Sequence, residues 1–201
     1  MKLLIEHPLV VTVNDQDEVI EDGALVIEGK WIRYVGPANQ VPPGPFDRVL
    51  DAREMIAIPG LVNAHCHSPA NIHRGLLPGR PLEIWRAYWR STLRVMKAED
   101  FYASALLGAA EMLRTGTTTV LDHFFGNQAI PFMGAGEAIR AMRELGLRHV
   151  VALTLSDKRY EETVPLDQQP GQPSAEIQRM TQSETQDART WLETCDAFIA
   201  K

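Results

Sequence analysis

Two histidines separated by one residue, His65 and His67, are the side chains whose spacing could do chemistry in this sequence. They close the stretch IAIPGLVNAHCH at residues 56–67. On a β-strand, residues i and i+2 share one face and lie about 7 Å apart at Cα, so both imidazoles can reach one divalent ion while Cys66 points the other way. Neutral imidazole nitrogens suit zinc or iron. The alternative is a pair of ordinary exposed histidines at a strand end, because so short a motif also arises by chance.

Further segments accompany the histidine pair: PGLVNAHCH at residues 59–67 is followed by HRGLL at 73–77, by Trp85 and by LRTGTTTVLDH at 113–123. This set resembles the amidohydrolase superfamily, in particular its branch of cytosine deaminases, adenosylhomocysteine deaminases and chlorohydrolases. The resemblance implies an α/β fold, a metal-dependent-hydrolase TIM (β/α)8 barrel of which about the first three β/α units are present. It also implies a small β-sandwich ahead of the barrel, built in the family from both chain ends and present here in its N-terminal part.

The resemblance implies a metal-binding set that this chain holds only in part. In the family, the paired histidines of the first strand are joined by two histidines from the fifth and sixth strands and an aspartate from the eighth, while a glutamate moves protons. His65 and His67 match the first pair, and no histidine follows His149. The later-strand Glu, His and Asp are therefore expected to be absent. This leaves the catalytic residues unknown and predicts a truncated chain that is inactive alone.

Three residues are candidates for contact with a substrate. Trp85 stands eighteen positions beyond His67, where adenosylhomocysteine-deaminase-like members place a tryptophan that contacts substrate. The alternative is a core tryptophan in an amphipathic helix. His123 directly follows a predicted strand and is expected at the barrel mouth, either against the substrate or as a structural histidine. Arg74 either contacts the substrate or supports its loop by hydrogen bonds to the backbone.

The reaction that the resemblance implies is metal-dependent hydrolysis of a non-peptide carbon–nitrogen bond, with metal-activated hydroxide as the nucleophile. Members that bind a nucleoside hold its ribose with an acidic residue nine positions after the tryptophan, but Arg94 stands there in this chain. An aminohydrolase (deaminase) of a heterocyclic base is therefore favoured. The alternatives are a triazine-type chlorohydrolase or N-dealkylating hydrolase, and a non-catalytic truncated remnant that needs a partner chain. One divalent metal ion is expected, zinc in first place and iron as the alternative, and a homo-oligomer in the full-length form.

Three further residues, outside the predicted ligand and substrate contacts, have expected positions or roles. Asn63 is placed by alternation on the strand face of the two histidines, as a ring acceptor or a packing residue. Asp122 is expected to orient the barrel mouth by hydrogen bonds. His149 is expected near the start of the third barrel strand and far from the site.

Composition narrows the class of protein. The 201-residue chain is 45% hydrophobic with a formal net charge of −6, which is typical of a globular protein and argues against nucleic-acid binding. No stretch approaches the roughly 20 apolar residues of a membrane span, and residues 1–13 lack the pattern of a signal peptide. We therefore expect a cytoplasmic protein with no membrane partner. The two cysteines, Cys66 and Cys195, lack the spacing of a disulfide framework or a zinc site.

The elements that must position these residues change in type near residue 57. Residues 1–57 predict short strands separated by turns, with a hairpin around Gly29-Lys30, and are assigned to the N-terminal part of the composite β-sandwich. The strands are expected at residues 2–5, 9–13, 24–28, 31–35 and 48–50. Residues 58–201 predict alternating helices and strands, the pattern of parallel βαβ units, and are assigned to the first part of the barrel. After the histidine strand, helices are expected at 81–97, 98–115, 131–145 and 173–195, strands at 117–122 and 147–155, and a polar loop at 156–172.

Overall fold

The computed structural model describes residues 1–76, 78–125, 134–156 and 187–200, together with positions 158, 162, 175 and 179. The chain forms two compact units, Met1–Gly60 and Leu61–Lys201, which we call the N-terminal and C-terminal units. The division follows a Pro-Gly pair, just ahead of the strand that carries the two histidines. That the N-terminal unit is one part of a composite sandwich stays a prediction.

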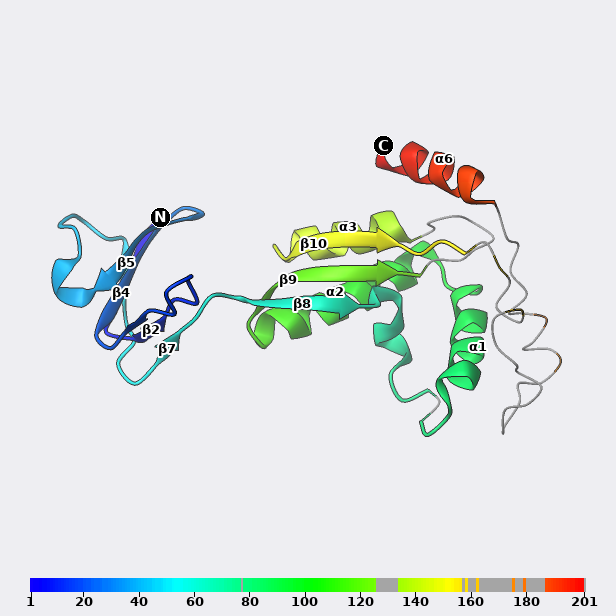
Figure 1. Ribbon diagram of the computed structural model, residues 1–201, viewed down its shortest axis with the longest axis horizontal. Coiled ribbons are helices and arrows are strands. Elements are labelled where there is room, and N and C mark those ends of the chain that lie inside the picture. Colours follow the sequence, from blue (N-terminus) through cyan, green and yellow to red (C-terminus); the bar gives the residue numbers. More distant parts are fainter. Residues whose placement is uncertain are drawn as a thin grey trace. The chain divides into compact units, whose positions relative to one another are not determined.

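Two small sheets make up the N-terminal unit (Figure 1). The four-stranded sheet has the order β5-β4-β1-β6, and its strands are β1 Lys2–Glu6, β4 Gly23–Glu28, β5 Trp31–Pro37 and β6 Arg48–Asp51. The three-stranded sheet has the order β3-β2-β7, and its strands are β2 Leu9–Val11, β3 Val19–Ile20 and β7 Ile56–Ala57. A short 3₁₀ helix, η1 Ala38–Gln40, follows β5.

The predicted hairpin of this unit is confirmed. β4 and β5 pair antiparallel across the Gly29-Lys30 turn, where Gly29 takes a φ of +60° that glycine adopts without strain. β3 and β7 were not predicted, because each contributes only two residues and alternation cannot be read over so short a stretch. The core of the four-stranded sheet is small and is formed by Leu4, Ala24 and Val26.

Three parallel strands form the sheet of the C-terminal unit in the order β10-β9-β8. Their bounds are β8 Leu61–Cys66, β9 Thr117–Phe124 and β10 Arg148–Leu153. Helix α2 (Ala98–Arg114) connects β8 to β9, and α3 (Ala135–Glu144) leads into β10; both lie along one face of the sheet (Figure 1). The other helices described are η2 Ser68–His73, α1 Leu82–Leu93 and α6 Ala188–Ile199. The predicted parallel βαβ pattern is confirmed.

Small side chains let α2 and α3 pack closely over β9, the central strand. Val120 and Phe124 of β9 are buried under the two helices. Alanines occupy much of the helix contact: Ala105 and Ala109 on α2, and Ala135, Ala138 and Ala141 on α3. Because alanine brings little bulk, the helix backbones can approach the sheet and each other, and this fixes the strand ends that carry the site.

The helix ends differ in detail from the prediction. α2 ends at Arg114, one residue before its expected end, and is followed closely by Gly116, whose φ is +86°. α1 ends at Leu93, four residues early. The expected start of the next helix, at residue 131, lies outside the described residues, and α3 is described from Ala135. Most of the expected loop at 156–172 and of the expected helix at 173–195 also lies outside them; α6 continues to Ile199.

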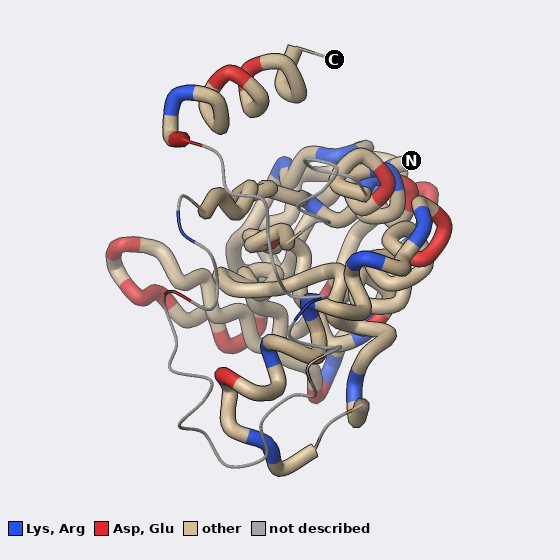
Figure 2. The backbone as a smooth tube through the Cα atoms, turned by 90° about the vertical axis from the view of Figure 1, so that its right-hand side faces the viewer, with Lys and Arg blue, Asp and Glu red and all other residues tan. Residues whose placement is uncertain are grey.

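Charged residues of both signs are interspersed along the described backbone (Figure 2). Some pair on the helix surface, as Arg140 does with Glu137 and Glu144 on α3. Across the part of the chain that the structure describes, no helix combines the length and the apolar character needed to span a membrane.

Candidate metal centre

His65, near the C-terminal end of β8, and His67, the residue directly after the strand, face each other. Nε2 of His65 lies 3.3 Å from Nε2 of His67, and the two rings meet edge to face at 82°. Two nitrogens bound to one tetrahedral zinc ion at about 2.0–2.1 Å stand about 3.3–3.4 Å apart. The shared face predicted by alternation is confirmed, and the separation of the ring nitrogens fits a common metal ion.

A backbone carbonyl fixes the ring of His67. Its Nδ1 lies 2.7 Å from the carbonyl oxygen of His123 on β9. A carbonyl oxygen only accepts hydrogen bonds, so Nδ1 carries the proton and Nε2 keeps its lone pair. This is the tautomer that a metal ligand needs, held by an acceptor of the kind that metal-binding histidines use.

His123 lies beside the histidine pair. Its ring centroid is 4.4 Å from that of His65 and 6.2 Å from that of His67. Among the residues described, however, no three His, Cys, Asp or Glu side chains are arranged to hold a metal ion. The geometry therefore brings His123 to the site without making it a third ligand, and its contact with a substrate stays a prediction.

Two aromatic rings that the sequence did not single out border the site. The ring of Trp89, on α1, is 5.8 Å from that of His67, and the ring of Phe125, just after β9, is 5.3 Å from it. Trp85 stacks on Trp89 at 5.3 Å, so Trp85 stands behind the ring that reaches the histidine. The signal for Trp89 was its position four residues after Trp85, on the same helix face.

The opposite face of β8 turns toward α2, and Asn63 lies there, not beside the histidines. Its Nδ2 donates to the sulfur of Met112 at 3.5 Å, and its Oδ1 accepts from the backbone N–H of His65 at 3.1 Å. A register shift between Asn63 and Cys66 puts one extra residue into β8 and reverses the expected alternation. Burial and the charge of Asp122 raise the pKa of the Cys66 thiol to about 12, so it stays protonated at neutral pH.

Asp122 and His149 form a buried pair next to this face of β8. Oδ1 of Asp122 accepts from the backbone N–H of Ser68 at 3.0 Å, and Oδ2 lies 3.2 Å from Nε2 of His149. The expected hydrogen bonds of Asp122 are present, and that they orient the barrel mouth stays a prediction. His149 lies near the start of β10, as expected, and the parallel pairing of β10 with β9 brings its side chain onto Asp122. That it lies far from the histidine pair stays a prediction.

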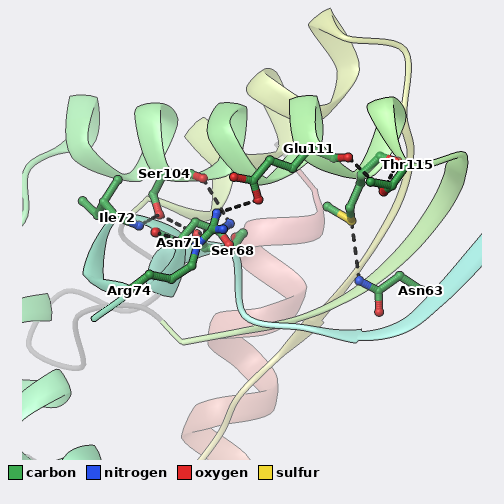
Figure 3. Close-up of polar contacts among 9 residues, drawn as sticks. Asn63, Ser68, Asn71, Ile72, Arg74, Ser104, Glu111 and Thr115 are labelled. Carbon is green, nitrogen blue, oxygen red and sulfur yellow. Dashed lines mark hydrogen bonds and ion pairs between the residues drawn. The ribbon is translucent and has the colours of Figure 1, made fainter. Parts of the chain in front are cut away.

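Arg74 is directed to α2 (Figure 3). Its Nη2 lies 2.7 Å from Oε2 of Glu111, and its Nε donates to the carbonyl of Asn71 at 3.1 Å. It lines a cavity of about 380 Å³ together with Cys66, whose side chain lies on the strand face away from His65. These contacts fit a residue that supports its loop, the alternative to its predicted contact with substrate.

Comparison with known proteins places these features in a family. The chain is 35% identical over 153 residues to a 5-methylthioadenosine/S-adenosylhomocysteine deaminase of Symbiobacterium thermophilum, covering 75% of this chain and 33% of the relative. The corresponding deaminase of Pyrococcus furiosus is 34% identical over 157 residues, covering 78% of this chain and 33% of the relative. The chain thus spans about a third of the length of these curated relatives.

Solved structures show the same fold. An atrazine chlorohydrolase from Arthrobacter aurescens, complexed with zinc, superposes with a TM-score of 0.65 and 27% identity over 80% of this chain and 37% of that one. A guanine deaminase of E. coli superposes with a TM-score of 0.56 and 19% identity over 79% of this chain and 37% of that one. The predicted fold class, α/β with the first part of a (β/α)8 barrel, is confirmed. The profile of the amidohydrolase family matches residues 56–199, and the chain belongs to this family of metal-dependent hydrolases.

Proposed function

We propose that His65 and His67 bind one divalent metal ion, zinc in first place, in a hydrolase that acts on a carbon–nitrogen bond of a small heterocyclic substrate. The observation that carries the proposal is the 3.3 Å separation of the two Nε2 atoms, which matches two corners of a tetrahedral zinc site. The tautomer of His67 supports it, because the carbonyl of His123 leaves Nε2 free to bind metal. Imidazole nitrogens also suit iron, which is the second choice.

The residues around His65 and His67 exclude water from the site and orient the substrate. When bound, a zinc ion provides the Lewis acidity that makes hydroxide available from water near neutral pH. Trp89 and Phe125 border His67. Trp89 is 2% exposed and excludes water from one side of His67, whereas the partly buried Phe125 can pack its ring on a flat heterocycle. Trp85 stiffens this wall by stacking on Trp89. His123, adjacent to His65, is the polar group that we place against the substrate.

Two ligands hold zinc more weakly than the three or four of known sites. We infer that the other ligands, and the groups that move protons, come from protein outside the described residues, as the family resemblance implies. A homo-oligomer is one arrangement in which a second copy lies near the site, and it stays a prediction.

Deamination is the first choice of reaction. Curated relatives between 30% and 35% identical, from several organisms, are named 5-methylthioadenosine/S-adenosylhomocysteine deaminases. A chlorohydrolase that acts on triazines is the second candidate, because the atrazine enzyme is 27% identical to this chain and Arg94 stands where nucleoside-binding members carry an acid. Both reactions need an electrophilic ring carbon, and they differ in the group that leaves. Release of ammonia or of chloride from the metal-loaded protein therefore separates them.

Calorimetric titration of the purified chain with Zn²⁺ tests the metal site. We expect one weak site per chain that is lost in the His65→Ala/His67→Ala double variant, because both ligands are removed. His7→Ala is the matched control: His7 is a histidine of the N-terminal unit, where it contacts Asp22 at 2.7 Å. Equal zinc binding by the double variant and the unaltered chain, or no zinc binding by either, would contradict the proposal.

A further inference from the structure

We propose that Asp122 is a positioning residue for His67 and acts through the backbone of Ser68, the next residue along the chain. The inference rests on the proposed role of His67 as a metal ligand. Asp122 is a buried carboxylate whose hydrogen-bond partners are Ser68 and His149, not the histidine pair itself.

Asp122 lies in the interior of the C-terminal unit. Its side chain is 0% exposed, and that of His149 is 5% exposed. Removing a carboxylate from water costs several kcal/mol unless hydrogen bonds replace its hydration. Asp122 has two such bonds: from the backbone N–H of Ser68 and from Nε2–H of His149. Its neighbours on the same strand face, Val120 and Phe124, are apolar, so packing alone would favour an apolar residue here.

The carbonyl of Ser68 is held just as firmly from the other side (Figure 3). Oγ of Ser104, on α2, donates to it at 2.7 Å, and Nδ2 of Asn71 donates to it at 3.2 Å. Asn71 also donates to the carbonyl of Ser104 at 3.1 Å. The side chain of Asn71 packs directly against Gly108 of α2, and a Cβ added to Gly108 would come within 2.2 Å of Nδ2 of Asn71. We call Asp122, Ser104 and Asn71 the Ser68 clamp.

The clamp fixes the two peptide planes that follow His67. Asp122 holds the N–H end of the plane between His67 and Ser68, and the carbonyl end of this plane accepts from the backbone N–H of Ala70 at 2.9 Å. Ser104 and Asn71 hold the plane after Ser68. Orienting the first plane sets the ψ angle of His67 and so the direction in which its Cβ leaves the chain. The imidazole then needs one further contact, Nδ1 to the carbonyl of His123, to bring Nε2 to 3.3 Å from His65. Without Asp122 the Ser68 N–H is a buried donor with no acceptor, and the plane can turn to find one.

Asp122→Ala and Asp122→Asn test the proposal as a pair. The alanine removes the acceptor, whereas the amide oxygen of asparagine can still accept from Ser68. We expect Asp122→Ala to weaken zinc binding by about 10-fold to 100-fold, the usual effect of losing a partner behind a metal ligand, and Asp122→Asn to stay within a few-fold of the unaltered chain. Val120→Ala is the matched control, because it opens a cavity on the same strand face without touching Ser68.

A second measurement needs no metal. Long-range ¹H–¹⁵N correlation of the imidazole rings in the metal-free chain reports which nitrogen of His67 carries the proton. We expect the Nδ1–H tautomer in the unaltered chain, in Asp122→Asn and in Val120→Ala, and a mixture of tautomers in Asp122→Ala. A merely structural role of Asp122 would lower stability and leave this signature unchanged.

The double variant Asp122→Leu/His149→Phe keeps the test valid where Asp122→Ala does not fold. Replacing a buried polar pair by apolar side chains of similar size is often neutral for stability, and it still removes the acceptor of Ser68. We expect the same loss of zinc affinity. Zinc binding that depends on His65 and His67 but survives both Asp122→Ala and the double variant overturns the positioning role alone. Zinc binding that ignores the histidines overturns the proposed function instead.

Discussion

Gly134 lies where α3 begins, directly against the ring of Phe101. A Cβ built on it would come within 2.2 Å of that ring, and its φ of +86° is one that side chains with a Cβ adopt only with strain. Gly136, two residues later, has a free neighbourhood: an added Cβ meets nothing within 4 Å. Substituting each glycine by alanine therefore distinguishes the stability effect of the close contact with Phe101 from the effect of restricting the unfolded chain.

We expect Gly134→Ala to lower the free energy of unfolding by about 2–4 kcal/mol, from backbone strain and from displacement of Phe101. Gly136→Ala should raise it by about 0.4–1 kcal/mol, because alanine restricts the unfolded chain and fits the helix. Urea denaturation of the two variants measures both changes. Equal effects of the two substitutions would show that the contact with Phe101 does not matter.

The positions of some site residues could be predicted from the sequence, whereas those of others could not, for physical reasons. The period of two in a strand placed His65 and His67 on one face, and their 3.3 Å contact agrees. The same period misplaced Asn63, since an extra residue in one strand leaves no trace in the spacing of a single sequence. Trp89 could be assigned to a helix face, but which of two stacked tryptophans reaches a histidine depends on how that helix packs.

At the scale of elements, the order of helices and strands in residues 58–153 followed from hydrophobic periodicity and glycine stops. Helix α2 and strand β9 fall within two residues of their expected bounds, because a strong pattern and a glycine with positive φ delimit them. Two-residue strands such as β3 and β7 exist only through their pairing with β2, which local sequence does not reveal. The parallel register of β10 on β9, which joins His149 to Asp122, is likewise a tertiary result.

Helix α6 begins at a strong N-cap. Oδ1 of Asp187 accepts from the backbone N–H groups of Arg189 and Thr190, at 3.0 and 3.1 Å, and Oδ2 accepts from the hydroxyl of Thr190 at 2.7 Å. These bonds lower the pKa of the Asp187 carboxyl, the hydroxyl bond most of all. Because the folded form favours the carboxylate, the cap stabilises α6 at pH values above the ordinary carboxyl pKa of about 3.9.

We expect α6 to fray as the pH falls through about 3.9 toward the lower pKa of the folded state, since protonation removes the charge from the cap. Asp187→Ala should fray the first turn at every pH, whereas Asp187→Asn should keep the cap and lose the pH dependence. Cα chemical shifts of Arg189 and Thr190, followed from pH 7 to pH 2, measure the helix. A profile of Asp187→Asn that matches the unaltered chain would contradict the role of the carboxylate.

At the scale of the whole molecule, both units expose large apolar side chains. In the C-terminal unit, Val62 is 68% exposed and Val150 is 56% exposed, on the two outer strands of the three-stranded sheet. Within the described residues, β8 and β10 each pair with β9 alone, so each also leaves one edge unpaired. An exposed apolar strand with a free edge is a template for association with another chain.

We therefore expect the 201-residue chain to self-associate, and the Val62→Lys/Val150→Lys double variant to shift it toward the monomer, because lysine protects strand edges. Val13→Lys is the matched control: Val13 is 67% exposed and lies outside the strands. Light scattering after size-exclusion chromatography gives the mass of each species. A monomeric unaltered chain, or an equal shift in the control, would count against this surface.

The register shift between Asn63 and Cys66 leaves one residue of β8 without a partner on β9, and this affects how the site responds to deletions. Between Asn63 and Cys66 three steps along β8 match two along β9, so deleting Ala64 removes this shift and keeps both imidazoles on one face, while the opposite shift between Leu61 and Val62 remains. Deleting Cys66 makes the histidines consecutive and turns them to opposite faces. We expect zinc binding to survive the first deletion and to vanish with the second, as calorimetric titration would show. This stretch would thus tolerate the loss of Ala64 and lose its metal site with the loss of Cys66, two residues further along the chain.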